Sequence, residues 1–174
     1  GYAIDVGDIN GDNFDDLVVG AYNNDEAGED AGATYVNYGP LSTDRSLPDS
    51  DAIVRGQIGE ASGYSLCVNG DLNADGVKDL VIGAYKSGTG ADEGGTTYIF
   101  TLSLIGDLST SDATYALVGT SSQGHSGFSV STSDANGDGN DDLIIGAYQE
   151  TNSVMWDGGT YFLYGPIPSS GDLP

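Results

Sequence analysis

The residues best suited to chemistry form a nine-residue pattern that occurs three times, at residues 8–16, 71–79 and 134–142. Each copy has an oxygen-bearing side chain at positions 1, 3, 5 and 9 of a turn rich in Gly and Asn. Alternate residues of such a turn can direct their oxygens toward one centre. Carboxylate and carboxamide oxygens without His or Cys suit a hard cation, above all Ca²⁺.

The pattern therefore predicts three calcium sites. The predicted side-chain ligands are Asp8, Asn10, Asp12 and Asp16, then Asp71, Asn73, Asp75 and Asp79, then Asp134, Asn136, Asp138 and Asp142. An EF-hand is the obvious alternative, but it needs a Glu at position 12, where this sequence has Val19, Ile82 and Ile145. It also needs flanking helices, whereas runs typical of strands flank these loops. We therefore set the EF-hand aside.

The loops belong to a longer repeat. Units start at Gly1-Tyr2, Gly63-Tyr64 and Gly127-Phe128, which divides the chain into residues 1–62, 63–126 and 127–174. The third unit ends before the counterpart of residues 49–62, so we expect it to lack its last strand. Repetition at this period is typical of arrays and propellers.

Short runs rich in β-branched and aromatic residues follow each loop and predict strands. The predicted second strands are residues 17–22, 80–85 and 143–148, the third strands are 34–38, 97–100 and 160–164, and the fourth strands are 52–54 and 115–118. The Gly-Ala pair inside each second strand indicates a close backbone approach or a bulge. These elements predict an all-β fold with one four-stranded antiparallel sheet about every 63 residues. Radial repetition of such sheets builds β-propeller blades, and a propeller usually has about four to eight. We therefore expect a segment of a larger propeller or repeat array.

Charge excludes some partners. Acidic residues outnumber basic residues 27 to 4, and the formal net charge is −23. Nucleic acid is not expected because no basic surface could neutralise its phosphates. No apolar stretch is long enough to predict membrane insertion. Loops of this kind need high free calcium, which favours an extracellular or cell-surface location. Cys67, the only cysteine, is expected to be an inert strand residue.

The Gly-Tyr or Gly-Phe starts, the acidic loops and the Gly-Ala strands resemble the FG-GAP repeats of integrin α-subunits over the whole chain. That resemblance implies a β-propeller and Ca²⁺ bound by the side chains at positions 1, 3, 5 and 9. It also implies a carbonyl ligand at position 7, which is Phe14, Val77 or Asn140. Two departures stand out. Tyr22, Tyr85 and Tyr148 replace the proline of the family's Gly-Ala-Pro, and Asn13 stands where the other loops have Gly76 and Gly139.

Enzymatic function is not predicted. His125 is the only histidine, and we interpret it as a surface loop residue rather than a general base. Paired carboxylates leave a polysaccharide-active enzyme domain as the less favoured alternative, although most of these carboxylates belong to the metal loops.

Two non-enzymatic functions remain. The first is adhesion or surface interaction with a protein or glycan ligand, with calcium in a structural role. Its recognition face would comprise residues 23–30, 86–93 and 149–157, including Met155 and Trp156. The second is an extracellular fibre or surface array, in which copies of the chain join by adding a strand to an open sheet edge.

Overall fold

The computed structural model describes residues 1–44, 46–150, 157–167 and 171–173 of this chain. The described part is built from strands and two short 3₁₀-helices. The first sheet contains β1 (Ala3–Gly7), β2 (Asp16–Ala21), β3 (Ala33–Asn37) and β4 (Ala52–Arg55), and each strand runs antiparallel to the next. All four lie within the first predicted unit.

The same strand order recurs in the second sheet. It contains β5 (Ser65–Gly70), β6 (Asp79–Ala84), β7 (Thr96–Phe100) and β9 (Tyr115–Val118), again antiparallel. The third sheet contains β10 (Ser126–Ser133), β11 (Asp142–Ala147) and β12 (Gly159–Leu163). The prediction of repeated antiparallel sheets is confirmed. The predicted second strands extend one residue too far, since β2, β6 and β11 end at the alanine before each Tyr.

Two parallel strands were not predicted. β8 (Gly106–Ser109) comes from the second unit but pairs with β4 of the first sheet. β13 (Gly171–Asp172) comes from the third unit and pairs with β9 of the second sheet. The short helix η2 (Thr110–Asp112) directly follows β8, and η1 (Leu47–Asp49) precedes β4. Through β8 and β13, the second and third units each add a strand to the preceding sheet, which becomes five-stranded.

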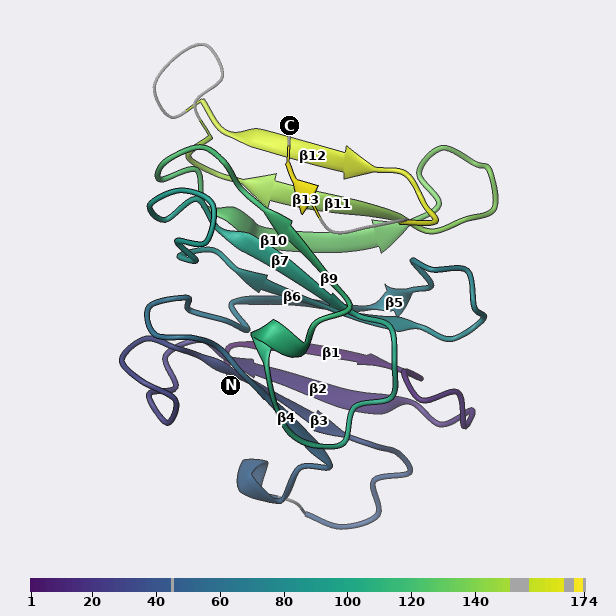
Figure 1. The fold of residues 1–174 in the computed structure, drawn as a ribbon. Coiled ribbons are helices and arrows are strands. Elements are labelled where there is room, and N and C mark those ends of the chain that lie inside the picture. The colour runs from purple at the N-terminus through teal and green to yellow at the C-terminus, as the bar shows by residue number, and fades with distance from the viewer. Residues whose placement is uncertain (45, 151–156, 168–170, 174) are drawn as a thin grey trace.

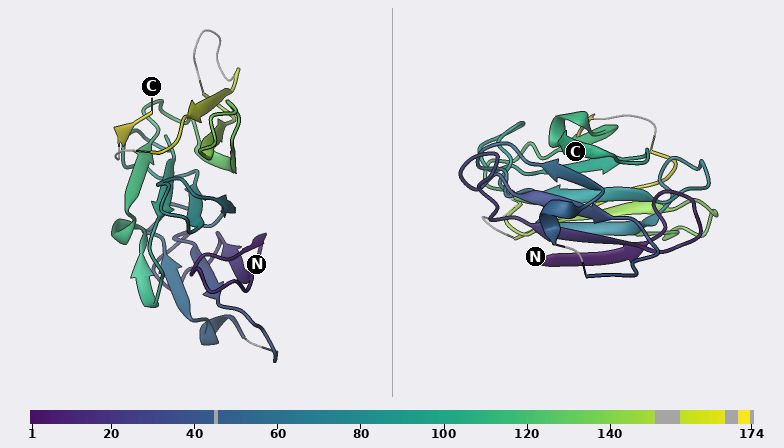
Figure 2. Two further views of the ribbon diagram at one scale, coloured as in Figure 1. Left: turned by 90° about the vertical axis from the view of Figure 1, so that its right-hand side faces the viewer. Right: turned by 90° about the horizontal axis from the view of Figure 1, so that it is seen from below.

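The three sheets stack face to face (Figures 1 and 2). Successive strand residues point to opposite faces, so the middle sheet contributes to two apolar cores. One core packs Val18 and Val36 of the first sheet against Leu80 and Ile82 of the second. The other core packs residues of the opposite face of β6 and β7 against β11, and its members include Val81, Ile99, Leu143 and Ile145. Because both of its faces are covered, every residue of β6 is buried.

The first two Gly-Ala pairs lie where two units approach closely, whereas Gly146 of the third pair faces Ser129 of its own unit. A Cβ atom added to Gly20 would lie 2.1 Å from the carbonyl oxygen of Gly63, and one added to Gly83 would lie 2.1 Å from that of Gly127. No side chain fits at such a separation, so the predicted close approach is confirmed. Cys67 lies in a strand, β5, as predicted, and its side chain is buried.

The two ends of the stack differ. The loops that join the first and second strands of each sheet, residues 8–15, 71–78 and 134–141, project from one end, on the right in Figure 1. The loops that join the second and third strands project from the other end. Since neighbouring strands are antiparallel, the aromatic residue at each unit start lies at this second end, beside the Tyr after Gly-Ala.

Candidate metal centre

The three acidic loops share a hydrogen-bonded framework centred on the Asp at position 1, and in the second loop Asp71 accepts from the amides of Asp75 and Gly76 only. In the first loop, Asp8 Oδ1 accepts hydrogen bonds from the backbone amides of Gly11 at 2.7 Å and Asp12 at 3.1 Å, and Oδ2 accepts one from Asn13 at 2.8 Å. Asp134 makes the same three contacts in the third loop. Burial acts to raise the pKa of Asp8, but the backbone donors outweigh it and hold that pKa below its ordinary value. The framework therefore favours the charged carboxylate.

Positions 3 and 5 complete this framework. Asn10 Oδ1 accepts from the Asp12 amide at 2.9 Å, and Asp12 Oδ1 accepts from the Phe14 amide at 2.9 Å. The amide group of Asn10 also donates to Asp12 Oδ2 at 3.1 Å. Equivalent contacts occur in the second and third loops. The structure thus brings the predicted ligands at positions 1, 3 and 5 together on each loop.

The Asp at position 9 lies beneath the loop and is buried in all three copies. Asp16 Oδ2 accepts from the Ile9 amide at 2.9 Å, and its Oδ1 accepts from the Gly39 amide at 2.8 Å. Asp142 likewise accepts from the amides of Ala135 and Gly165. The Asp at position 9 therefore supports the loop from inside the sheet, and one of its oxygens accepts a hydrogen bond from the backbone amide of position 2.

The second loop differs at this buried position. Asp79 Oδ2 accepts from the Leu72 amide at 2.7 Å, but its Oδ1 is buried without a hydrogen-bond partner. The residue that corresponds to Gly39 is Leu102, whose side chain is largely exposed. Burial, with added repulsion from Asp71 and Asp75, raises the pKa of Asp79 to about 7. An unpartnered oxygen next to repelling carboxylates is an environment that a cation would satisfy.

The donor set of each loop fits calcium. All predicted side-chain ligands are oxygen donors. In the first and second loops, the carboxylates at positions 1 and 5 also repel the carboxylate at position 9. Among the described residues, no three His, Cys, Asp or Glu side chains converge as a ready-made metal cluster. Each loop instead combines Asp with Asn, and its position-9 carboxylate faces backbone amides. At the predicted carbonyl ligands, Phe14 is exposed while Val77 and Asn140 are partly buried.

Backbone strain distinguishes the loops. Position 6 is left-handed in all three, with φ of 69° at Asn13, 90° at Gly76 and 92° at Gly139, so the substitution of Asn for Gly is accommodated. Position 4 is also left-handed, and there the second loop has Ala74 with φ 59°, whereas the others have glycine. An L-residue other than Asn or Asp is strained in this region.

Ala74→Gly is therefore expected to stabilise the chain by about 1 kcal/mol. Gly137→Ala, the reverse change at the same position of the third loop, should destabilise by a similar amount. A Cβ there would meet no atom within 4 Å, so conformation alone would decide the result. Urea unfolding of both variants measures the effect, and equal stabilities would contradict it.

Asp79 also predicts a pH dependence of the metal-free chain. Its folded pKa of about 7 lies above the unfolded value of 3.8, so the folded state binds the extra proton. The stabilisation is complete below the unfolded pKa and is lost as pH rises through the folded pKa. In chelator, wild type should therefore lose about 1–3 kcal/mol relative to Asp79→Asn between pH 4 and pH 7. Parallel stability curves for the two proteins would show that Asp79 titrates normally.

His125 is not a surface residue, so that prediction is wrong. Its side chain is 6% exposed. The ring stacks on Tyr148 with centroids 5.0 Å apart and lies 5.6 Å from Tyr85, while Nε2 is 3.3 Å from Glu93 Oε2. The tyrosines that replace proline in the Gly-Ala-Pro pattern create this apolar site, a consequence that is visible only once the units are stacked.

These aromatic residues form a continuous row at the end opposite the acidic loops. Neighbouring rings have centroids 4.4–5.6 Å apart, within the range of favourable aromatic pairs. The aromatic row consists of Tyr2, Tyr22, Tyr64, Tyr85, Phe128, His125 and Tyr148. Tyr2 is 59% exposed and Tyr148 is 47% exposed. Spacing in the sequence did not reveal the row, because its members come from the unit starts, from the residues after the Gly-Ala pairs and, for His125, from the end of the second unit.

Stacked antiparallel sheets, each with a turn loop at the same end, define a segment of a β-propeller. The FG-GAP repeat family model matches residues 1–37 and 126–162. These two segments are therefore FG-GAP repeats.

Several known proteins are similar to the chain. It is 32% identical to integrin alpha-5 of Xenopus laevis over 91% of its length, and 38% identical to integrin alpha-3 of Cricetulus griseus over 52%. It is also 34% identical to the phosphatidylinositol-glycan-specific phospholipase D of Mus musculus over 83% of its length. These matches span 15%, 9% and 18% of the three relatives. The chain thus corresponds to a small part of much longer proteins.

Proposed function

We propose that this chain is a calcium-binding module of an extracellular or cell-surface protein, in which calcium is structural and the opposite end of the sheets binds a protein or glycan. The observation that carries the proposal is the separation of these two ends. The acidic loops lie together at one end, and the loops between second and third strands lie at the other (Figure 1). The aromatic row lies at this second end, because its rings belong to the unit starts and to the residues after the Gly-Ala pairs. Similarity to integrin α-subunits supports the assignment to adhesion.

A structural role for calcium follows from the place of each loop. The loop joins the first two strands of a sheet and concentrates carboxylates that repel one another. Neighbouring loops are also connected, since Asp141 of the third loop accepts a hydrogen bond from the Asp71 amide at 2.9 Å. A cation in each loop would offset this repulsion and hold the strand turns, with Asp at positions 1, 5 and 9 and Asn at position 3 as ligands.

The ligand surface is proposed at the aromatic row. Tyrosine rings offer apolar area together with a hydroxyl group, which suits both protein and glycan partners. A hollow of about 460 Å³ lies beside Tyr2 and Tyr22 and is bordered by Asn23 and Asn24. Met155 and Trp156, the other predicted contact residues, lie outside the described residues.

Binding to an array of purified matrix proteins and glycans tests this surface. We expect calcium-dependent binding that Tyr2→Ala and Tyr148→Ala weaken. Phe162→Ala is the matched control, because Phe162 is 56% exposed but lies outside the aromatic row. Equal loss in all three variants would place the ligand elsewhere.

The fibre alternative has one observation in its favour. In the described part of the chain, β12 lies at the edge of the third sheet, and the nearby Phe162 and Tyr164 are exposed. Open strand edges can pair with another chain. Electron microscopy of the chain in millimolar calcium distinguishes the two functions, since filaments would support self-assembly and discrete particles would support the interaction module.

We propose a non-enzymatic role, although the phospholipase D relative is named as an enzyme. The only histidine is buried in the aromatic row, and most paired carboxylates belong to the acidic loops. No described helix has the length and apolar character needed to cross a membrane.

A further inference from the structure

A buried polar cluster occurs where the first and second sheets meet, and we name it the first hub. Its centre is Glu60, which is 4% exposed and belongs to the first unit. Glu60 accepts hydrogen bonds from Tyr98 at 2.6 Å, Thr110 at 2.9 Å and Ser87 at 3.4 Å, all in the second unit. Burial, with a further contribution from Glu60, raises the pKa of Tyr98 to about 12. At the first hub, the preceding unit supplies the carboxylate and the following unit supplies the hydroxyl groups.

A second hub occupies the junction between the second and third sheets, but its carboxylate comes from the other side. Glu150, 2% exposed, belongs to the third unit. It accepts hydrogen bonds from Tyr161 of its own unit at 2.7 Å and from the Ser121 hydroxyl of the preceding unit. Here the following unit supplies the carboxylate.

Backbone contacts show that the two hubs are equivalent places. The Glu60 carbonyl accepts from the Lys86 amide at 3.3 Å, and the Gly124 carbonyl accepts from the Gln149 amide at 3.3 Å. Gly124 therefore occupies the place of Glu60. By the same comparison of backbone contacts, Glu150 occupies the place of Ser87. A Cβ on Gly124 would lie only 2.8 Å from Glu150 Oε2, so the two carboxylates use the same space.

We propose that the side that carries the carboxylate determines which repeat units can be neighbours. We call the following unit's part of each hub its socket, which comprises the residue at the place of Ser87 and the neighbouring tyrosine. A loop like that of Glu60 placed against a socket like that of Glu150 would bury two carboxylates together. A loop like that of Gly124 placed against Ser87 and Tyr98 would leave hydroxyl groups without their acceptor. Each error leaves buried polar groups uncompensated, and such penalties produce specificity between similar surfaces.

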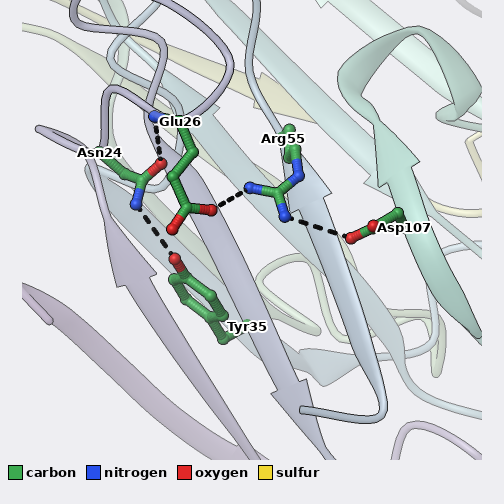
Figure 3. A network of polar contacts seen from close by, with 5 residues as sticks. All are labelled: Asn24, Glu26, Tyr35, Arg55 and Asp107. Carbon is green, nitrogen blue, oxygen red and sulfur yellow. Dashed lines mark hydrogen bonds and ion pairs between the residues drawn. The ribbon is translucent and has the colours of Figure 1, made fainter. Parts of the chain in front are cut away.

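The first unit carries a third type of socket at the equivalent place (Figure 3). Asn24 corresponds to Ser87 and donates to the Tyr35 hydroxyl at 3.1 Å. Arg55 bridges Glu26 at 2.5 Å and Asp107 at 3.3 Å. The three units therefore present three different sockets behind the same tyrosine, as a code for unit order requires.

Exchanging the hubs tests the proposal. Gly124→Glu should lower the Tm by roughly 10 °C, because it buries a second carboxylate beside Glu150. Glu150→Ser should also lower it, by removing the acceptor for Tyr161. The double variant recreates the Glu, Ser and Tyr arrangement of the first hub, with Leu173 in the place of Thr110, and should recover most of the loss. The reciprocal pair, Glu60→Gly with Ser87→Glu, should behave in the same way at the first hub.

The comparison is a double-mutant cycle, so the test is whether the effect of the two substitutions together differs from the sum of their separate effects. Losses that simply add in both pairs would overturn the proposal. Gly124→Gln controls for size, since it has nearly the same shape as Gly124→Glu without the charge. It should keep a clearly higher Tm, and it remains informative if Gly124→Glu fails to fold. An equal loss in Gly124→Gln would show that crowding, not charge, separates the hubs and would also overturn the proposal.

Discussion

Removal of calcium is expected to lower the Tm of this chain by about 15–30 °C. A ligand that binds only the folded state at a hundredfold excess over its Kd stabilises by about 2.7 kcal/mol, and three loops with the same framework would add these contributions. For a domain of this size, each kcal/mol corresponds to roughly 2–4 °C. Thermal unfolding followed by circular dichroism, before and after chelation, measures the shift.

Calcium returned in excess should restore the original Tm. Magnesium at the same concentration is the control, because it is smaller and demands a stricter octahedral geometry. An unchanged Tm after thorough chelation would remove the basis for all three sites.

Substitution of Asp75 is expected to separate the metal-binding and structural roles of a loop. Asp75 Oδ1 accepts from the Val77 amide at 2.8 Å, and its charge raises the pKa of the buried Asp79. Asp75→Asn keeps an acceptor for Val77 and removes the charge. Calcium affinity of this loop should fall on the order of 10–100-fold, while the metal-free Tm stays constant or rises slightly.

Asp75→Ala removes both the charge and the acceptor for the Val77 amide, so it should lower the calcium affinity and the metal-free Tm together. Titration calorimetry should show two sites in place of three at moderate calcium concentrations. Asp92→Asn is the control, since this exposed aspartate lies in the loop after β6, at the opposite end of the sheet. Three undisturbed sites in Asp75→Asn would refute its role as a ligand.

The sequence predicted the antiparallel sheets well because the relevant information is local. Strands such as β2 and β6 are short apolar runs bounded by turn residues, and the loop pattern sets their spacing. The acidic loops were predictable for the same reason, since their framework connects residues at most five positions apart, such as Asp8 and Asn13. The close approach at Gly20 also followed from residue type.

Most of what the sequence did not reveal depends on contacts between units. β8 has little apolar character, and it becomes a strand because the open edge of β4 lies beside it. The burial of His125 requires tyrosines from two units. Position 9 was predicted only as a ligand, although Asp16 also satisfies the buried amides of Ile9 and Gly39. The first two of these relations join different units, whereas the amides that Asp16 satisfies lie in its own unit, at spacings of 7 and 23 residues that recur at Asp142.

The return of β8 and β13 to the preceding sheet has a consequence for how such a chain can lengthen. A duplicated segment equivalent to residues 63–126 would carry its own copy of β8, and this strand would pair with the edge of the preceding sheet. The edge of the sheet in the new segment would in turn pair with a strand from the segment that follows. Tandem duplication can thus add a unit without leaving a new open edge inside the array. Deletion of residues 63–126 would also leave no open edge, but it would place Glu60 beside Glu150, the pairing that the two hubs disfavour. A cut within the period removes a strand from a neighbour that is otherwise intact.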